Sequence, residues 1–174
     1  ARSSGGGSKC GAGSSDCFAF QTPPSYTRWL KEAGFTVMTL ANNHAFDYGP
    51  SGRRQTVAAL TRAGIRNTGR PGTQATQTVK GQRVAILGFA PYDWADSLLD
   101  IPRAERRVQA AAQKAEIVVV TFHGGAEGSD RTRVPRGREV AFGENRGDLR
   151  AFTHAVVDAG ADIVIGHGPH VLRG

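Results

Sequence analysis

The feature that most constrains the fold of this chain is a helix that leads into an apolar strand through an Ala-Gly pair, because this pattern occurs three times. Residues 23–33 have a helical period with Thr22 as a candidate N-cap, and they end at Gly34 before the apolar stretch 35–41. The same order returns in a helix over 55–63 followed by a strand at 65–66, and in a helix over 148–159 followed by a strand over 162–165. The chain is therefore predicted to alternate helices with strands.

Two further stretches have the apolar character of strands that are buried on both faces. One is residues 82–90, which follow a Lys80-Gly81 turn, and the other is residues 116–122, with a helical stretch over 102–115 between them. Near-continuous apolar strands that alternate with helices are typical of a parallel sheet in an α/β protein. We therefore predict an α/β domain with a mostly parallel sheet that is covered on both faces.

The composition agrees with one soluble domain. The chain has 174 residues, of which 39% are hydrophobic and 21% charged, and its apolar runs are far shorter than the roughly 18 residues that a membrane span needs. It opens with a Gly/Ser-rich stretch, without the basic and apolar segments of a signal peptide. We expect an N-terminal loop over 1–16, a domain over 17–174 and no transmembrane segment.

A formal net charge of +7, carried mostly by arginine, favours an anionic partner. Nucleic acid is not expected, because the chain lacks an aromatic-interleaved basic stripe, zinc-finger spacing and a recognition-helix pattern. The segment 124–145 has no apolar period and is predicted to be a long loop, which is often functional. Its arginines would either clamp an anionic substrate or form a solvated loop: Arg131, Arg133, Arg136 and Arg138.

The two cysteines, Cys10 and Cys17, lie in the Gly/Ser-rich loop, where both side chains are expected to be exposed. Two free exposed thiols are the alternative to a disulfide. We favour the disulfide, because exposed thiols are reactive, and a disulfide implies an extracytoplasmic location.

Four of the five histidines fall at the carboxyl ends of predicted strands: His44, His123, His167 and His170. Parallel sheets of open α/β proteins place their ligands at this edge, so three segments bring imidazoles to one rim. Histidines together with the carboxamide of Asn43 suit a divalent ion such as Mn, Fe or Zn. The fifth, His154, lies off the apolar stripe of its helix and is expected on the surface.

Two carboxylates lie near these histidines. Asp47 would orient His44 or serve the turn before the next helix, and Glu127 would face the substrate or lie exposed in the loop. Arg146-Gly147-Asp148 has the form of an adhesion tripeptide, but Asp148 is better placed as a helix N-cap. Adhesion is therefore not expected.

Three segments in this order resemble successive motifs of the CapA family of poly-gamma-glutamate capsule synthesis proteins. They are residues 41–49 (ANNHAFDYG), 123–127 (HGGAE) and 160–171 (GADIVIGHGPHV), and the resemblance extends from residue 17 to the end of the chain. The family is similar to the calcineurin-like metallophosphatases. This resemblance implies a metallophosphatase-like four-layer α/β/β/α sandwich with two metal ions at the strand ends.

The resemblance also implies roles for individual residues. Asn43 and His123 match metal ligands, His44 matches the histidine that protonates the leaving group, and His167 with His170 matches a closing pair of ligands. The Gly-Asp strand with which the family begins is not in this chain. The sandwich is therefore expected to be incomplete at both ends, with two ions in the full-length protein.

The function that we expect is that of a metal-dependent hydrolase of poly-gamma-glutamate capsule synthesis, in which two ions activate water and His44 donates a proton. One alternative is a phosphoesterase or a peptide-modifying enzyme, unrelated to capsule, that hydrolyses its substrate or abstracts an alpha proton. Another is a non-catalytic surface protein that binds the polymer. The oligomeric state does not follow from the sequence.

Overall fold

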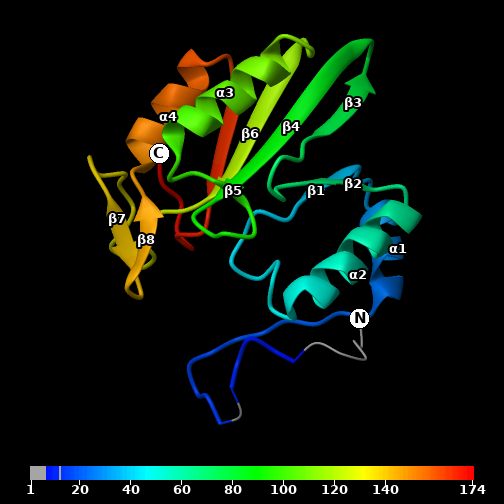
Figure 1. Ribbon diagram of the computed structural model, residues 1–174, viewed down its shortest axis with the longest axis vertical. Helices are drawn as coiled ribbons and strands as arrows, with labels where there is room; N and C mark the ends of the chain where they lie inside the picture. Colours follow the sequence, from blue (N-terminus) through cyan, green and yellow to red (C-terminus); the bar gives the residue numbers. More distant parts are fainter. Residues whose placement is uncertain (1–6, 12) are drawn as a thin grey trace. The chain divides into compact units, whose positions relative to one another are not determined.

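The computed structural model describes residues 7–11 and 13–174, and the chain divides into two compact units. Unit 1 comprises residues 1–38 and 43–67, and unit 2 comprises residues 39–42 and 68–174. The chain passes from one unit to the other along the short strands β1 (Val37–Thr39) and β2 (Arg66–Thr68), which pair with each other (Figure 1). The strand expected over 35–41 is therefore only three residues long, and it is half-buried.

Unit 1 contains a short 3-10 helix η1 (Pro24–Tyr26) and the helices α1 (Thr27–Glu32) and α2 (Gly49–Arg62). The prediction that Thr22 caps the first helix is wrong, because Pro23 occupies the N-cap position and its fixed backbone starts the 3-10 turn. α2 begins six residues earlier than its apolar period suggested, since Pro50 in its first turn suits a helix start.

The N-terminal loop of unit 1 is closed by a disulfide. Cys10 and Cys17 are bonded, with their Cα atoms 5.5 Å apart, which confirms the predicted pairing. The bridge lies next to Lys9, whose backbone N–H donates a 2.7 Å hydrogen bond to the carbonyl of Asp47. The loop is thereby attached to the segment that carries the first histidine motif.

Unit 2 is built on a sheet in the order β3 (Ala75–Val79), β4 (Gln82–Ala90), β6 (Ile117–His123), β9 (Ile163–His167). β4, β6 and β9 are mutually parallel, and the short β5 (Asp96–Ser97) runs parallel to the end of β4. The strands predicted over 82–90 and 116–122 are confirmed. β3 was not predicted, and it pairs antiparallel with β4 through Lys80 and Gly81, whose positive φ angles suit a two-residue hairpin turn.

Helices α3 (Ile101–Ala112) and α4 (Leu149–Asp158) pack together on one face of this sheet (Figure 1). Their buried side chains and those of β4 and β6 form one hydrophobic core, in which Phe152 contacts both Phe89 and Phe122 edge to face. The carboxylate of Asp148 accepts a hydrogen bond from the third residue of α4, as expected for an N-cap. The predicted α/β class is confirmed.

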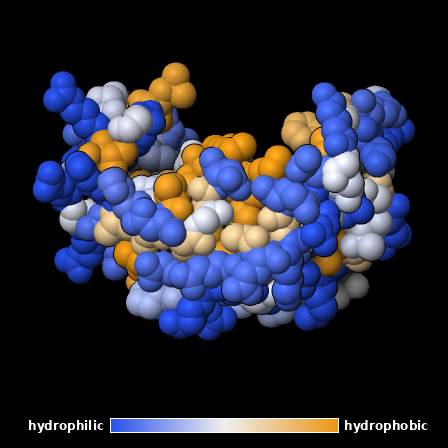
Figure 2. All heavy atoms as spheres, turned by 90° about the horizontal axis from the view of Figure 1, so that it is seen from above, coloured by the Kyte–Doolittle hydropathy of each residue, from blue (hydrophilic) through white to orange (hydrophobic). Residues whose placement is uncertain are grey.

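Among residues 7–11 and 13–174, the expected covering of both sheet faces is not found for β9. Its residues Ile163 and Ile165, which alternate with the core residue Val164, are 47% and 55% exposed. Other large hydrophobic side chains also remain at the surface, where Figure 2 shows them as orange atoms among hydrophilic blue ones. None of the helices in the described residues, 7–11 and 13–174, is long and apolar enough to cross a membrane.

The segment 124–145, predicted to be a long loop, ends in a hairpin of β7 (Glu139–Ala141) and β8 (Glu144–Gly147). The prediction failed because these short strands have polar sequences without an apolar alternation. The two strands pair antiparallel through their backbones, and a 2.9 Å ion pair joins the buried Glu139 of β7 to Arg173.

Candidate functional site

The residues predicted to form the site belong to both units. Asn43, His44 and Asp47 lie in unit 1, directly after β1, whereas the remaining histidines and Glu127 lie in unit 2. Each group has its own hydrogen-bonding environment.

In unit 1, the carboxylate of Asp47 holds the imidazole of His44. Asp47 is 2% exposed, and its Oδ2 lies 2.9 Å from His44 Nδ1 and accepts a 2.8 Å hydrogen bond from the backbone N–H of Phe20. The ring of Phe20 packs edge-on against the imidazole, with 4.5 Å between centroids. Because a carboxylate only accepts hydrogen bonds, this contact places a proton on Nδ1 of His44.

Lys9 is a site residue that the sequence reasoning missed. Its ammonium lies 2.7 Å from Asp47 Oδ1 and donates a 3.2 Å hydrogen bond to the backbone carbonyl of the half-buried Asn43. Nothing in the sequence joins it to a motif more than thirty residues away. The only local signal for Lys9 is the neighbouring Cys10, because the disulfide at Cys10 restrains the backbone next to Lys9.

In unit 2, His123 and His167 come together because they end adjacent parallel strands and are directly paired in register. Their Nδ1 atoms are 3.4 Å apart, and their rings meet edge to face. Burial lowers the pKa of His167, which favours its neutral, ligating form. Gly168, with a φ of +121°, turns the chain after β9, and a Cβ there would come within 3.2 Å of the His123 ring.

His170 is not brought into the same position. Its side chain is 74% exposed, and Nε2 lies 3.7 Å from the carboxylate of Glu127. His154, predicted as a surface residue, is exposed on α4 as expected.

Arg146 on β8 is the second residue that the sequence reasoning missed. It is 3% exposed, and its guanidinium forms ion pairs with Glu127 at 3.0 Å and with Glu144 at 2.9 Å. The same guanidinium donates a 3.2 Å hydrogen bond to Nε2 of His123. No local sequence signal identifies it, because two of its partners, His123 and Glu127, lie about twenty residues earlier in the sequence.

Tyr92 completes this group in unit 2. Its ring stacks on Trp94 with centroids 4.6 Å apart, and its hydroxyl lies 3.3 Å from the Glu144 carboxylate, to which it donates a hydrogen bond. Burial raises the pKa of Tyr92 well above its usual range, so the phenol is neutral at physiological pH. The guanidinium of Arg146 lies 5.9 Å from the centroid of the Tyr92 ring.

The loop arginines lie on the surface: Arg131, Arg133, Arg136 and Arg138 are all exposed or half-exposed. Arg131 has an ion pair with its neighbour Asp130 at 3.4 Å. These cations provide positive charge on this segment, without a formed clamp around a ligand.

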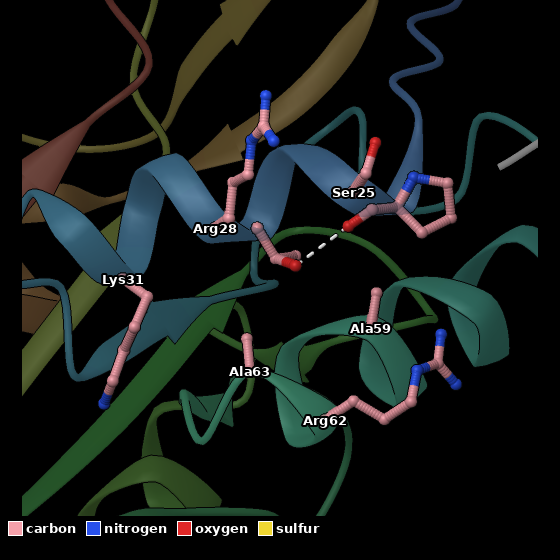
Figure 3. A pocket seen from close by; sticks show the side chains of 8 residues that line it. Ser25, Arg28, Lys31, Ala59, Arg62 and Ala63 are labelled. Atoms are coloured by element: carbon pink, nitrogen blue, oxygen red, sulfur yellow. Dashed lines mark hydrogen bonds between the residues drawn. The ribbon is translucent and has the colours of Figure 1, made fainter.

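A separate pocket of about 390 Å³ lies in unit 1 between η1, α1 and α2. It is lined by the basic residues Arg28, Lys31 and Arg62, but Figure 3 shows that their charged ends point away from one another. None of the predicted site residues lines it. The charged groups that line this pocket therefore do not converge on a single ligand.

The His123 and His167 pair suits one metal ion. Two nitrogens bound to the same tetrahedral ion at about 2.0–2.1 Å lie about 3.3–3.4 Å apart, which matches the 3.4 Å between the two Nδ1 atoms. Within residues 7–11 and 13–174, no group of three or more His, Cys, Asp or Glu side chains is arranged to hold a metal. The pair could therefore contribute two nitrogens to an ion.

Comparisons with known proteins agree with the motifs. Residues 7–174 match the family model "Bacterial capsule synthesis protein PGA_cap". The capsule biosynthesis protein CapA of Bacillus anthracis is 36% identical over 164 residues, covering 83% of this chain and 37% of that protein. The PGA biosynthesis protein CapA of Bacillus subtilis is 32% identical over 174 residues, covering 88% and 41%.

A crystal structure of a hypothetical protein from Thermus thermophilus aligns with 22% identity and a TM-score of 0.49, over 84% of this chain and 50% of that one. The chain spans about two fifths of the length of the two CapA relatives. The family match covers nearly all of this chain, including every histidine at the strand ends. The chain belongs to the PGA_cap family of bacterial capsule synthesis proteins.

Proposed function

We propose that this chain is part of a metal-dependent hydrolase that acts on an anionic polymer, such as poly-gamma-glutamate, during capsule synthesis. The observation that carries the proposal is the pair of imidazoles on β6 and β9, whose Nδ1 atoms are 3.4 Å apart at the carboxyl ends of parallel strands. Ligand sites of open α/β sheets lie at this edge.

In this proposal His123 and His167 hold one divalent ion, Mn, Fe or Zn, and the family resemblance adds His170 of the same unit as a further ligand. The resemblance also assigns Asn43 of unit 1 as a metal ligand. A second ion belongs to the full-length protein. When bound, such ions polarise a phosphoryl or acyl oxygen and lower the pKa of water.

His44 serves as the proton donor to the leaving group. Asp47 keeps the proton of Nδ1 in place, so that Nε2 is the nitrogen that exchanges protons with a substrate. Lys9 shares the same carboxylate, with its ammonium 2.7 Å from Oδ1 of Asp47.

The substrate class follows from the charge and from the relatives. The protein is basic overall, and the arginines between residues 131 and 138 would attract a polyanion. One relative is named for PGA biosynthesis and another for capsule biosynthesis. The disulfide between Cys10 and Cys17 supports a location at the cell envelope, outside the reducing cytoplasm.

Metal analysis of the full-length protein tests the proposal. Protein purified without a chelator should contain Mn, Fe or Zn, and the substitutions His123→Ala and His170→Ala should lower the occupancy. His154→Ala is the matched control, because His154 is an exposed histidine of the same unit. Equal metal loss from the control would contradict the proposed site.

A second candidate is a non-catalytic protein that binds the polymer, and the four surface arginines of the loop favour it. A phosphoesterase or a peptide-modifying enzyme unrelated to capsule would use the same histidines. Polymer cleavage and polymer binding should therefore be measured together. Loss of cleavage with retained binding in the Asn43→Ala protein would favour the enzyme, and unchanged cleavage would favour the binding protein.

A further inference from the structure

The environment of His123 contains a contact that is unusual for a metal-binding histidine. A ligating imidazole almost always donates its second ring N–H to a carboxylate, a carbonyl or water. Nε2 of His123 instead faces Arg146, whose Nη1 lies 3.2 Å away. A guanidinium carries only donors, so Nε2 must accept this hydrogen bond with its lone pair.

This hydrogen bond fixes the tautomer of His123. A neutral imidazole has one N–H, and since Nε2 is the acceptor, the proton is on Nδ1. That N–H points at Nδ1 of His167, 3.4 Å away. The nitrogen that would bind an ion jointly with His167 is thus the nitrogen that carries the proton.

We propose that Arg146 competes with metal binding at the His123 and His167 pair. This inference rests on the proposed function, because it concerns the same ion. Binding of an ion at Nδ1 of His123 moves the ring proton to Nε2, where it would meet a donor of Arg146. Metal binding and the hydrogen bond between Arg146 and His123 are therefore mutually exclusive.

Arg146 is suited to such an exchange because it keeps other partners. Its ion pairs with Glu127 at 3.0 Å and with Glu144 at 2.9 Å remain when the bond to His123 is lost. The guanidinium is therefore not left buried without a counter-charge, which would cost far more than one hydrogen bond. Without metal, Arg146 occupies the second nitrogen of His123, and with metal it is held by the two carboxylates.

The test uses Co²⁺ as a spectroscopic probe of the full-length protein, titrated after removal of metal. Arg146→Gln replaces a donor-only group by an amide that can accept from Nε2–H, and it should bind Co²⁺ about 10-fold to 100-fold more tightly, the range by which outer partners of metal ligands change affinity. Arg146→Lys, which keeps both the charge and the donors, should stay close to the wild-type affinity.

Two controls separate the hydrogen bond from general effects. Arg173→Gln removes a different buried arginine side chain of unit 2, paired with Glu139 at 2.9 Å, and should leave Co²⁺ affinity unchanged. Arg146→Gln combined with Glu127→Gln keeps the net charge of the group and should still tighten binding. If the Arg146→Gln protein does not fold, the double variant provides the same measurement of Co²⁺ affinity.

The tautomer provides a readout that does not depend on metal. Nitrogen NMR of metal-free protein with ¹⁵N-labelled histidine should show His123 protonated at Nδ1 in the wild type and in Arg146→Lys. In Arg146→Gln the proton should move toward Nε2. A purely structural role of Arg146 would leave the tautomer unchanged.

The outcomes distinguish this inference from the proposed function. If His167→Ala abolishes Co²⁺ binding while Arg146→Gln binds no more tightly than wild type, the competition is overturned and the metal site stands. If neither the wild type nor Arg146→Gln binds Co²⁺, the proposed function is overturned together with this inference.

Discussion

His44 in unit 1 and His123 in unit 2 are held by neighbours of opposite charge. The carboxylate of Asp47 accepts from Nδ1 of His44, whereas the guanidinium of Arg146 donates to Nε2 of His123. The first contact places a proton on Nδ1 of His44, and the second requires a lone pair on Nε2 of His123. Two histidines that both follow or end a strand thus differ in whether the neighbouring side chain accepts a hydrogen bond from the ring or donates one to it.

Replacing the proton donor would test this difference most strongly. In the full-length protein, His44→Asn should lower polymer hydrolysis by about 10² to 10⁴, the range for a lost general acid, while metal content stays nearly the same. The loss should be smaller for substrates whose leaving group departs without a proton. A folded His44→Asn protein with full turnover would contradict the role, and His154→Asn is the matched control.

Removing the disulfide would test whether the loop supports the His44 environment. Replacing Cys10 and Cys17 by serine opens a short loop and should lower the free energy of unfolding by about 2.5 kcal/mol in the chain-entropy account. Chemical unfolding monitored by circular dichroism measures the loss. Thiol labelling provides a check, since the untreated wild type should show no reactive thiol. Labelling of two thiols there would contradict the bridge.

The charge of Asp47 is the next feature to change. Asp47→Asn keeps an acceptor for His44 but removes the ion pair with Lys9 at 2.7 Å, so we expect a loss of about 2 kcal/mol, as for hydrogen bonds to charged groups. Thermal unfolding measures it. Asp16→Asn, at an exposed position in the same unit, should change stability little. Equal losses would mean that Asp47 has no special role.

An exposed pair provides the smallest expected effect. The side chain of Arg83 donates to Glu116 at 3.1 Å and lowers the pKa of that carboxyl. A lowered pKa stabilises the fold above the ordinary glutamate pKa of about 4.3, and this stabilisation is lost as the pH falls through the folded value. Glu116→Gln should therefore cause a slight loss in urea unfolding at pH 7 and a smaller one at pH 3. A loss of equal size at both pH values would contradict the assignment.

The sequence predicts those helices and strands whose apolar residues recur in a regular pattern. β4, β6 and α4 were found within one or two residues of their bounds, because a buried strand or helix needs a regular apolar pattern. β3, β7 and β8 were missed, since they are short and polar. They pair across two-residue turns with positive φ angles, at Lys80-Gly81 and Phe142-Gly143, which an apolar pattern does not record.

The candidate site also has a part that the sequence predicts and a part that it does not. The meeting of His123 and His167 could be anticipated, because parallel strands bring their carboxyl ends to one edge. Lys9 and Arg146 could not, because each acts on a histidine motif that is distant in sequence. The sequence thus predicts which imidazoles are present, whereas the side chains that determine their protonation depend on the tertiary fold.

β9 also affects whether this protein stays monomeric in solution. It is the last strand of its sheet among the described residues, so one row of its backbone N–H and C=O groups has no strand beside it. Ile163 and Ile165 are partly exposed on the same strand, and no Lys, Arg, Asp or Glu lies within its bounds to discourage pairing. Concentrated solutions of this chain alone should therefore self-associate through β9, and the substitution Ile165→Lys should keep it monomeric.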